Sequence, residues 1–222
     1  YSALAAAGAF TLADTARLLR LRGEAMQKAV PVGEGAMAAI IGLEFGPVAA
    51  VATEAARQLH LEAAVCQAAN DNGGGQVVIS GTKSAVEKAM ELAKAAGAKR
   101  SLLLPVSAPF HCALMQPAAE AMATALAGVN ISAPRVPLVA NVLAAPITDP
   151  AEIRQRLVEQ VTGTVRWRES IAFMAADGVT TFYEIGAGKV LSGLVKRIAE
   201  SATGVSIGAP ADIAAFKTAR QG

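Results

Sequence analysis

Apolar residues recur at helical spacing near the start of the chain and give way to short continuous runs further along. Thr11 and Asp14 form a Thr-x-x-Asp pattern typical of a helix N-terminus, and apolar positions then repeat every three or four residues up to Val30. This pattern predicts a helix over residues 11–30. From residue 33 onward, short apolar runs alternate with turn residues, which is typical of strands.

The segment between residues 33 and 106 predicts strands and helices in a fixed order. The strands are expected at 37–43, 63–69, 76–80 and 100–106, and the helices at 47–59 and 82–96. This β-α-β-β-α-β order is that of a ferredoxin-like unit, in which both helices cover one face of a compact sheet. We therefore expect a ferredoxin-like small subdomain at residues 33–106.

The rest of the chain alternates between helix and strand. Helices are predicted at 113–127, 150–161, 166–176, 189–200 and 211–220, and strands at 136–142, 180–185 and 204–207. Such alternation builds a mostly parallel α/β sheet. We expect residues 1–32 and 107–222 to form a large α/β subdomain that the small one interrupts, with a ligand site in the cleft between them.

Composition narrows the functional classes. The 222 residues are 53% hydrophobic, enough for a substantial core, and 20 basic and 18 acidic residues are spread along the chain without a nucleic-acid footprint. Apolar stretches end before the roughly 20 residues that a bilayer crossing needs. The two cysteines, Cys66 and Cys112, lack metal-binding spacing, so we expect reduced thiols, a cytoplasmic protein and no zinc site.

Arg22 lies in the middle of the apolar stripe of the first predicted helix. Its neighbours at helical spacing are apolar: Leu18, Leu19, Ala25 and Met26. A guanidinium there must reach solvent or meet an anion, because an unpaired buried charge is costly. A salt bridge to a core carboxylate and a clamp on a ligand carboxylate both satisfy this requirement. The clamp would select a dicarboxylic acyl group.

His111 follows a predicted strand and precedes a predicted helix, where α/β proteins present functional groups to a crevice. It is either a catalytic base or a buried, structurally satisfied histidine. A nucleophile to accompany it is not evident. Gly204 to Gly208 match G-x-S-x-G, but Ser206 lies within an apolar strand segment that Ala-Pro follows, so we interpret it as a strand residue. Cys112 adjoins His111, and adjacent side chains rarely face one another.

The glycine-rich turns do not predict nucleotide binding. The turn at 72–75 lacks the Lys-Ser/Thr of a phosphate-binding loop and opens no helix, and the turn at 186–188 lacks the third glycine of a dinucleotide motif. Asn70 and Asn72 either line the predicted cleft or form Asx turns.

Several blocks are distinctive in their order and spacing: Tyr-Ser-Ala-Leu at 1–4, Leu-Arg-Gly at 21–23, and the segments 35–43, 76–81, 105–115, 141–142, 160 and 184–191. Together they resemble the malonyl-CoA:acyl carrier protein transacylase family of bacterial fatty-acid synthesis, and the resemblance extends over almost the whole chain. In this family a GHSLGE nucleophile elbow directly precedes the Tyr-Ser-Ala-Leu segment. The resemblance therefore implies an α/β-hydrolase-like large subdomain whose nucleophile and GQGxQ oxyanion motif lie upstream of Tyr1. It predicts that residues 1–222 are inactive alone.

The resemblance also implies roles for particular residues. His111 would be the general base, oriented by the backbone carbonyl of Gln160, and Arg22 would clamp the malonyl carboxylate. Phe110, a bulky aromatic just before the histidine, would favour malonyl over methylmalonyl. The implied reaction passes malonyl from CoA through the serine to the phosphopantetheine thiol of acyl carrier protein.

Further expectations concern ligands and partners. We add Asn70 and Asn72 as substrate-binding candidates, and we expect a monomer without a bound cofactor, with malonyl-CoA as substrate and phosphopantetheine carried by the partner protein. Neither nucleic acid nor membrane is expected. One alternative is an acyltransferase domain or subunit of a polyketide synthase or malonate decarboxylase. The other is a non-catalytic module that binds acyl groups or the carrier protein.

Overall fold

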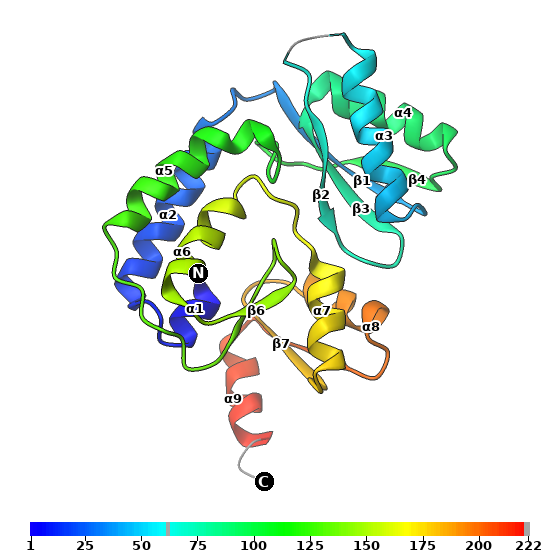
Figure 1. Ribbon diagram of the computed structural model, residues 1–222. Coiled ribbons are helices and arrows are strands. Elements are labelled where there is room, and N and C mark those ends of the chain that lie inside the picture. Colours follow the sequence, from blue (N-terminus) through cyan, green and yellow to red (C-terminus); the bar gives the residue numbers. More distant parts are fainter. Residues whose placement is uncertain (61–62, 220–222) are drawn as a thin grey trace. The chain divides into compact units, whose positions relative to one another are not determined.

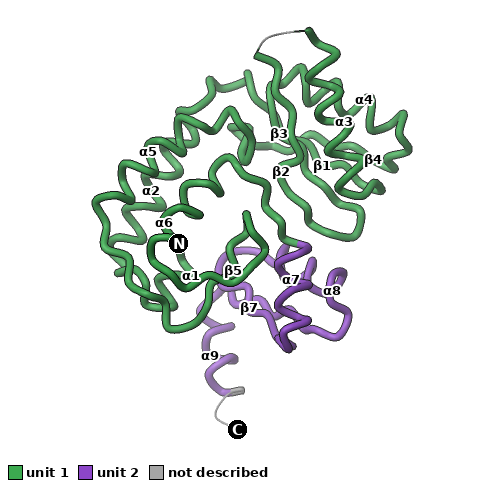
Figure 2. The backbone as a smooth tube through the Cα atoms, viewed as in Figure 1, with its two compact units in different colours: residues 1–167 green, residues 168–222 purple. Residues whose placement is uncertain are grey.

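The computed structural model describes residues 1–60 and 63–219 (Figure 1). The chain forms two compact units, Tyr1–Trp167 and Arg168–Gly222 (Figure 2). The boundary between them differs from the boundaries predicted at residues 33 and 106. The division into a small and a large subdomain therefore stays a prediction.

A four-stranded antiparallel sheet occupies one part of unit 1. Its strands are β1 (Gly35–Ile41), β2 (Cys66–Asp71), β3 (Gln76–Thr82) and β4 (Arg100–Leu103), in the order β2-β3-β1-β4. The helices α3 (Phe45–Gln58) and α4 (Lys83–Ala95) pack on the same face (Figure 1), where they bury Ile40 and Ile79. Because side chains alternate along a strand, Met37 and Val78 point to the other face. That second face becomes a wall of the site.

Helices dominate the rest of unit 1. They are α1 (Ser2–Ala6), α2 (Leu12–Lys28), a 3-10 turn (Ala113–Met115), α5 (Gln116–Ala127) and α6 (Pro150–Glu159). The predicted N-cap is confirmed, since Thr11 Oγ1 accepts a hydrogen bond from the backbone N–H of Asp14 at 3.0 Å. The helices α2 and α5 lie side by side (Figure 1), and one core joins them with α6 through Leu18, Met122 and Ile153.

Unit 2 contains α7 (Trp167–Ala176), β7 (Thr181–Ile185), α8 (Val190–Ile198), β8 (Thr203–Ile207) and α9 (Pro210–Ala219). The first residue of α7 still belongs to unit 1. Strands β7 and β8 are parallel, and α8 connects them. Ser206 is a residue of β8, as predicted, and its hydroxyl donates to the carbonyl oxygen of Gly188 at 3.3 Å. Arg220, the last residue of the predicted final helix, lies outside the described residues.

The structure differs from the predicted elements in several places. The strand expected at 136–142 as part of a parallel sheet is the short β5 (Leu138–Ala140), which pairs antiparallel with the unpredicted β6 (Ala145–Ile147). Three residues are too few to give a periodic signal. The strand expected at 63–69 begins at Cys66 and continues through Asp71. Strand β4 ends at Leu103 and is shorter than predicted, although the N–H of Leu104 still donates to the main-chain oxygen of Met37 at 2.9 Å.

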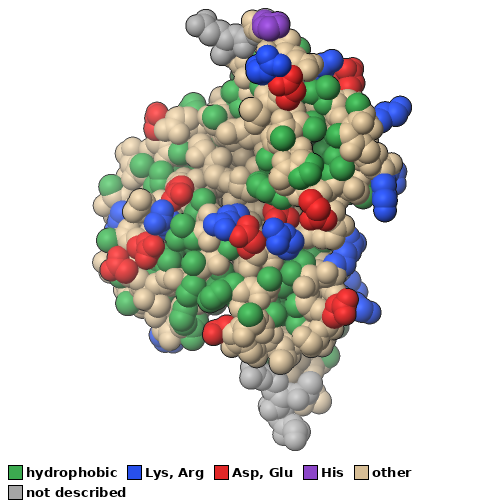
Figure 3. All heavy atoms as spheres, turned by 45° about the vertical axis from the view of Figure 1, so that its right-hand side comes forward, with side chains coloured by type: hydrophobic (Ala, Val, Ile, Leu, Met, Phe, Trp, Pro, Cys, Tyr) green, Lys and Arg blue, Asp and Glu red, His purple; other side chains and the backbone are tan. Residues whose placement is uncertain are grey.

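Charged and hydrophobic side chains are mixed on the surface of the protein. On the face drawn in Figure 3, basic and acidic side chains are interspersed among hydrophobic ones. Within the described residues, no helix is both long and apolar enough to cross a membrane, and no group of three or more potential metal ligands occurs. Cys66 and Cys112 are buried and free, as predicted.

Candidate active site

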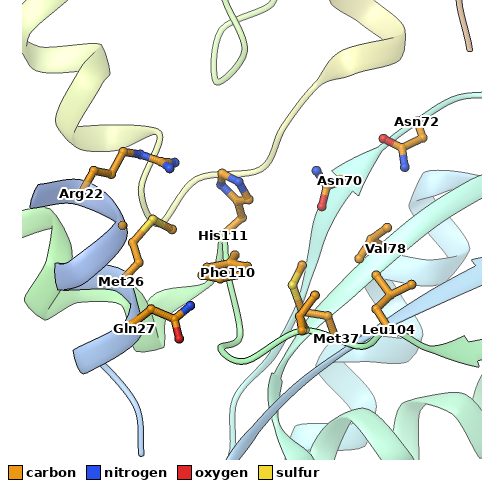
Figure 4. Close-up of a pocket in the computed structure, with 12 residues that line it drawn as sticks. Arg22, Met26, Gln27, Met37, Asn70, Asn72, Val78, Leu104, Phe110 and His111 are labelled. Atoms are coloured by element: carbon orange, nitrogen blue, oxygen red, sulfur yellow. The ribbon is translucent and has the colours of Figure 1, made fainter. Parts of the chain in front are cut away.

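A pocket of about 420 Å³ lies in unit 1, between α2 and the face of the sheet that α3 and α4 leave uncovered. It is lined by Arg22, Gly23, Met26, Gln27, Met37, Asn70, Asn72, Val78, Leu104, Val106, Phe110 and His111 (Figure 4). Five of the six candidate site residues named from the sequence are in this lining, and the sixth, Gln160, contacts two of them. Segments far apart in the chain thus form one chemically mixed cavity.

Arg22 extends from α2 toward the pocket (Figure 4). Its Nη2 donates to the side-chain oxygen Oε1 of Gln160 at 2.9 Å, and its Nε is buried without a hydrogen-bond partner. Among the described residues, no carboxylate lies within 4.0 Å of the guanidinium. Of the two alternatives for Arg22, the salt bridge to a core carboxylate is therefore not formed within the described residues.

The segment around His111 is held in an unusual backbone conformation. His111 has φ +59°, in the left-handed region that residues with a Cβ seldom adopt. Next to it, Cys112 Sγ donates to the carbonyl of Pro109 at 3.1 Å, and the N–H of Ala113 donates to Gln67 Oε1 at 2.6 Å. The first contact closes the turn that carries His111, and the second joins the start of the 3-10 turn to β2.

A hydrogen bond between the ring and the main chain determines the tautomer of the imidazole. Nδ1 of His111 lies 3.0 Å from the main-chain oxygen of Gln160, the residue that caps the C-terminus of α6. A carbonyl oxygen can only accept, so Nδ1 must carry the hydrogen and the neutral ring presents its lone pair on Nε2. The pocket therefore has a base with a defined basic atom.

Burial changes the acid–base properties of both key side chains. The pKa of His111 is lowered from its ordinary value of 6.5, mainly by burial, and the positive charge of Arg22 lowers it further. Hydrogen bonds to the backbone of Gln160 and Gly163 act in the opposite direction. Burial also lowers the pKa of Arg22, and the nearby Tyr1 opposes that effect. An arginine stays protonated at neutral pH, so the pocket combines a fixed cation with a neutral imidazole.

The other three candidates occupy the remaining walls. Phe110 lies directly beside His111, whereas Asn70 and Asn72 line the side formed by the end of β2 (Figure 4). Of the two roles left open for the asparagines, their position fits the cleft lining. The Asx-type contact at this turn comes instead from Asp71, whose Oδ1 accepts from the N–H of Gly73 at 3.2 Å.

The apolar wall of the pocket was not singled out from the sequence. Met26 comes one helical turn after Arg22, so helical spacing alone could have identified it. Met37 and Val78 could not be predicted as pocket residues. Alternate residues of their strands face α3 and α4, and the sequence does not show which face of the sheet the helices leave uncovered. Leu104 and Val106 follow β4, in a segment whose apolar run predicts strand.

Together these groups define the chemistry that the pocket can perform. A cation without a protein carboxylate partner can bind an anionic group, and a neutral imidazole can accept and return a proton. The apolar wall suits an uncharged chain attached to that anionic group.

Comparisons with known proteins identify the family of the chain. Residues 1–214 match the acyl transferase domain family. The chain belongs to this family, and the resemblance inferred from its sequence blocks is confirmed.

Similar proteins narrow the class. The malonyl CoA-acyl carrier protein transacylase of Salmonella typhimurium is 50% identical over 218 residues, which are 98% of this chain and 69% of the relative. A crystal structure of the acyl-carrier-protein-S-malonyltransferase of Bartonella henselae is 55% identical with a TM-score of 0.92, and the match covers 100% of this chain and 69% of that one. The malonyl-transacylase solved in complex with a type II PKS acyl-carrier protein is 42% identical with a TM-score of 0.91, over 98% of this chain and 69% of that one.

Proposed function

We propose that the protein transfers a malonyl group from CoA to the phosphopantetheine thiol of acyl carrier protein, as an enzyme of fatty-acid biosynthesis. One observation carries the proposal: a guanidinium without a carboxylate partner and an oriented imidazole line the same pocket. Arg22 binds the malonyl carboxylate, and His111 is the general base. The names of the relatives support the substrate and the acceptor.

The nucleophile in this proposal is a serine in the sequence that directly precedes Tyr1. Tyr1 stacks on Phe10 with ring centroids 6.2 Å apart, and it lies close enough to Arg22 for the two side chains to affect each other's pKa. Tyr1 therefore lies near Arg22. This nearness supports the position that the family resemblance gives to the serine.

The reaction proceeds in two balanced transfers. His111 Nε2 takes the hydroxyl proton as the serine oxygen attacks the thioester carbon, and the tetrahedral intermediate collapses as the carbon–sulfur bond breaks. The departing CoA sulfur receives the proton. In the second transfer His111 takes the proton of the phosphopantetheine thiol, whose sulfur attacks the serine ester, and the proton returns to the serine. No further co-reactant is needed.

The remaining candidates bind and select the substrate. Phe110 narrows the space beside the acyl group and disfavours an α-methyl substituent, whereas Asn70 and Asn72 provide amide groups along the route of the thioester arm. The apolar side chains of Met26, Met37 and Val78 pack against that arm.

The proposal extends to the fold. The parallel pair β7 and β8, connected by α8, has the connectivity of one repeat of a parallel α/β sheet. We assign it to an α/β-hydrolase-like large subdomain, into which residues 33–106 are inserted as the small ferredoxin-like subdomain. The strand order β2-β3-β1-β4 supports the ferredoxin-like assignment.

The test uses the protein with its natural sequence upstream of Tyr1 and radiolabelled malonyl-CoA. We expect a stable covalent adduct that hydroxylamine cleaves and that added holo-acyl carrier protein discharges. His111→Ala should abolish the adduct, whereas the exposed His60→Ala is the matched control and should not. Binding of malonyl-CoA without an adduct would overturn the enzyme and favour a binding module. If only a polyketide carrier protein accepts the malonyl group from the adduct, the polyketide alternative is favoured. One of the similar structures is a complex with such a type II PKS carrier.

A further inference from the structure

The side chain of Gln160 is fixed at both ends. Its Oε1 accepts from Arg22 Nη2 at 2.9 Å, and its Nε2 donates to the carbonyl oxygen of Leu157 at 2.9 Å. Only one orientation of the amide satisfies both contacts, because the flipped amide would place its NH₂ against the guanidinium and its oxygen against a carbonyl. The α6 helix thus holds an acceptor in a defined direction toward Arg22.

The main chain of the same residue makes a separate contact. The Gln160 carbonyl oxygen accepts from Nδ1 of His111, 49 positions away in the chain, whereas Arg22 is 138 positions away. One residue therefore orients both the acid–base group and the cation. The two functions use different atoms, so a substitution of the side chain can remove the contact with Arg22 and leave the carbonyl in place.

The neutrality of the amide matters for a ligand-binding arginine. A carboxylate at this position would pair with the guanidinium and compensate its charge before any ligand arrived. An amide oxygen orients one N–H and leaves the net charge available. The buried Nε of Arg22, which has no protein partner among the described residues, is a further donor that this arrangement leaves open.

We propose that the Gln160 side chain is a positioning residue that aims Arg22 at the free carboxylate of the acyl group and thereby sets the preference for dicarboxylic acyl chains. This inference rests on the proposed function. It assigns to Gln160 a second role, in specificity, that is independent of its backbone contact with the base.

The test compares malonyl and acetyl transfer in the protein with its natural upstream sequence. Gln160→Met keeps the length of the side chain and the main-chain carbonyl but removes both amide contacts. We expect kcat/KM for malonyl to fall about tenfold to a hundredfold, as for a lost hydrogen bond to a charged group, and acetyl transfer to change less than about threefold. Gln155→Met is the matched control, since Gln155 is exposed on the same helix. It should change neither rate.

Gln160→Glu provides a second measurement that does not depend on how well the methionine variant folds. It keeps the shape of the side chain and places a carboxylate beside Arg22, so malonyl transfer should fall further than in Gln160→Met while acetyl transfer should again fall much less. Equal losses for both acyl groups in the two variants, or no loss of malonyl transfer, would overturn the inference.

A double-mutant cycle separates this inference from the proposed function. If Gln160 acts through Arg22, adding Gln160→Met to Arg22→Met should cause less than about a twofold further change in malonyl transfer. Independent, multiplicative losses would overturn the positioning role. Arg22→Met with an unchanged malonyl rate would instead refute Arg22 as the clamp, and with it the proposed substrate preference.

Discussion

Nδ1 of His111 donates a hydrogen bond to the main-chain oxygen of Gln160 at 3.0 Å, so a neutral group orients the imidazole of this site. A carboxylate in the same place would stabilise the protonated ring and raise its pKa. A carbonyl oxygen fixes the tautomer with a weaker effect on the charge, and burial remains the main influence.

The pH dependence of the reaction should follow from this balance. His111 must be neutral to accept a proton, and its pKa is lowered below 6.5, so the neutral form persists into mildly acidic solution. We expect kcat/KM for malonyl transfer to be retained at pH 6.5 and to fall only as the pH drops through the lowered pKa. Rates measured from about pH 4.5 to 8.5 would give the midpoint of the acidic limb. A midpoint above 6.5 would contradict the assignment.

Arg22→Met should change both specificity and the titration of the base. Loss of a desolvated charge partner costs about 2–5 kcal/mol, so malonyl transfer should fall roughly thirtyfold or more while acetyl transfer falls less than about tenfold. Because the charge of Arg22 lowers the pKa of His111, its removal should move the acidic limb of acetyl transfer to higher pH. The exposed Arg20→Met, on the same helix, is the control and should show neither effect. Equal losses for both acyl groups would make Arg22 structural.

The local elements were more predictable from the sequence than the site was. Periodicity located both helices and all the strands of the four-stranded sheet, and the Thr11 cap, because these depend on residues close together in the chain. The half-buried position of Arg22 on α2 also followed from helical spacing. The pairing of β5 with β6 did not, since strands of three residues carry almost no pattern.

The relative arrangement of the site residues could not be derived from periodicity. Nothing in the pattern around Gln160 indicates that its carbonyl meets His111 and its amide meets Arg22, because both contacts depend on where the C-terminal end of α6 lies relative to residues far away in the chain. The resemblance to a family suggested the first contact. The second was found only in the structure.

Phe110→Ala should relax the choice of acyl group. The ring occupies the wall of the pocket beside His111, and its removal opens space for an α-methyl substituent. We expect the ratio of methylmalonyl to malonyl transfer to rise about tenfold, within the roughly 1–3 kcal/mol typical of such steric selection. Competition between the two CoA esters, followed by mass spectrometry of the acylated carrier, measures this ratio. Phe173→Ala, which alters a residue of α7 outside the pocket, should leave it unchanged, and a fixed ratio in both variants would remove Phe110 from the specificity.

Gly35→Ala should displace the base without touching it. A Cβ at Gly35 would lie 2.4 Å from the ring atoms Cγ and Cδ of Pro109, too close for the proline to keep its place. Pro109 is two residues before His111, whose left-handed backbone leaves little freedom to compensate for a shift of the proline.

The expected result of Gly35→Ala is a loss of about 1–3 kcal/mol in the free energy of unfolding together with a loss of activity. Malonyl and acetyl transfer should fall by the same factor, at least about tenfold, because a misplaced base affects both reactions equally whereas Arg22 stays in position. Gly46→Ala is the matched control, since a Cβ there meets nothing within 4 Å. Denaturant unfolding and kcat/KM for both thioesters measure the two effects. A selective loss of malonyl transfer would show instead that the displacement reaches Arg22, and unchanged rates would show that the Pro109 segment absorbs it.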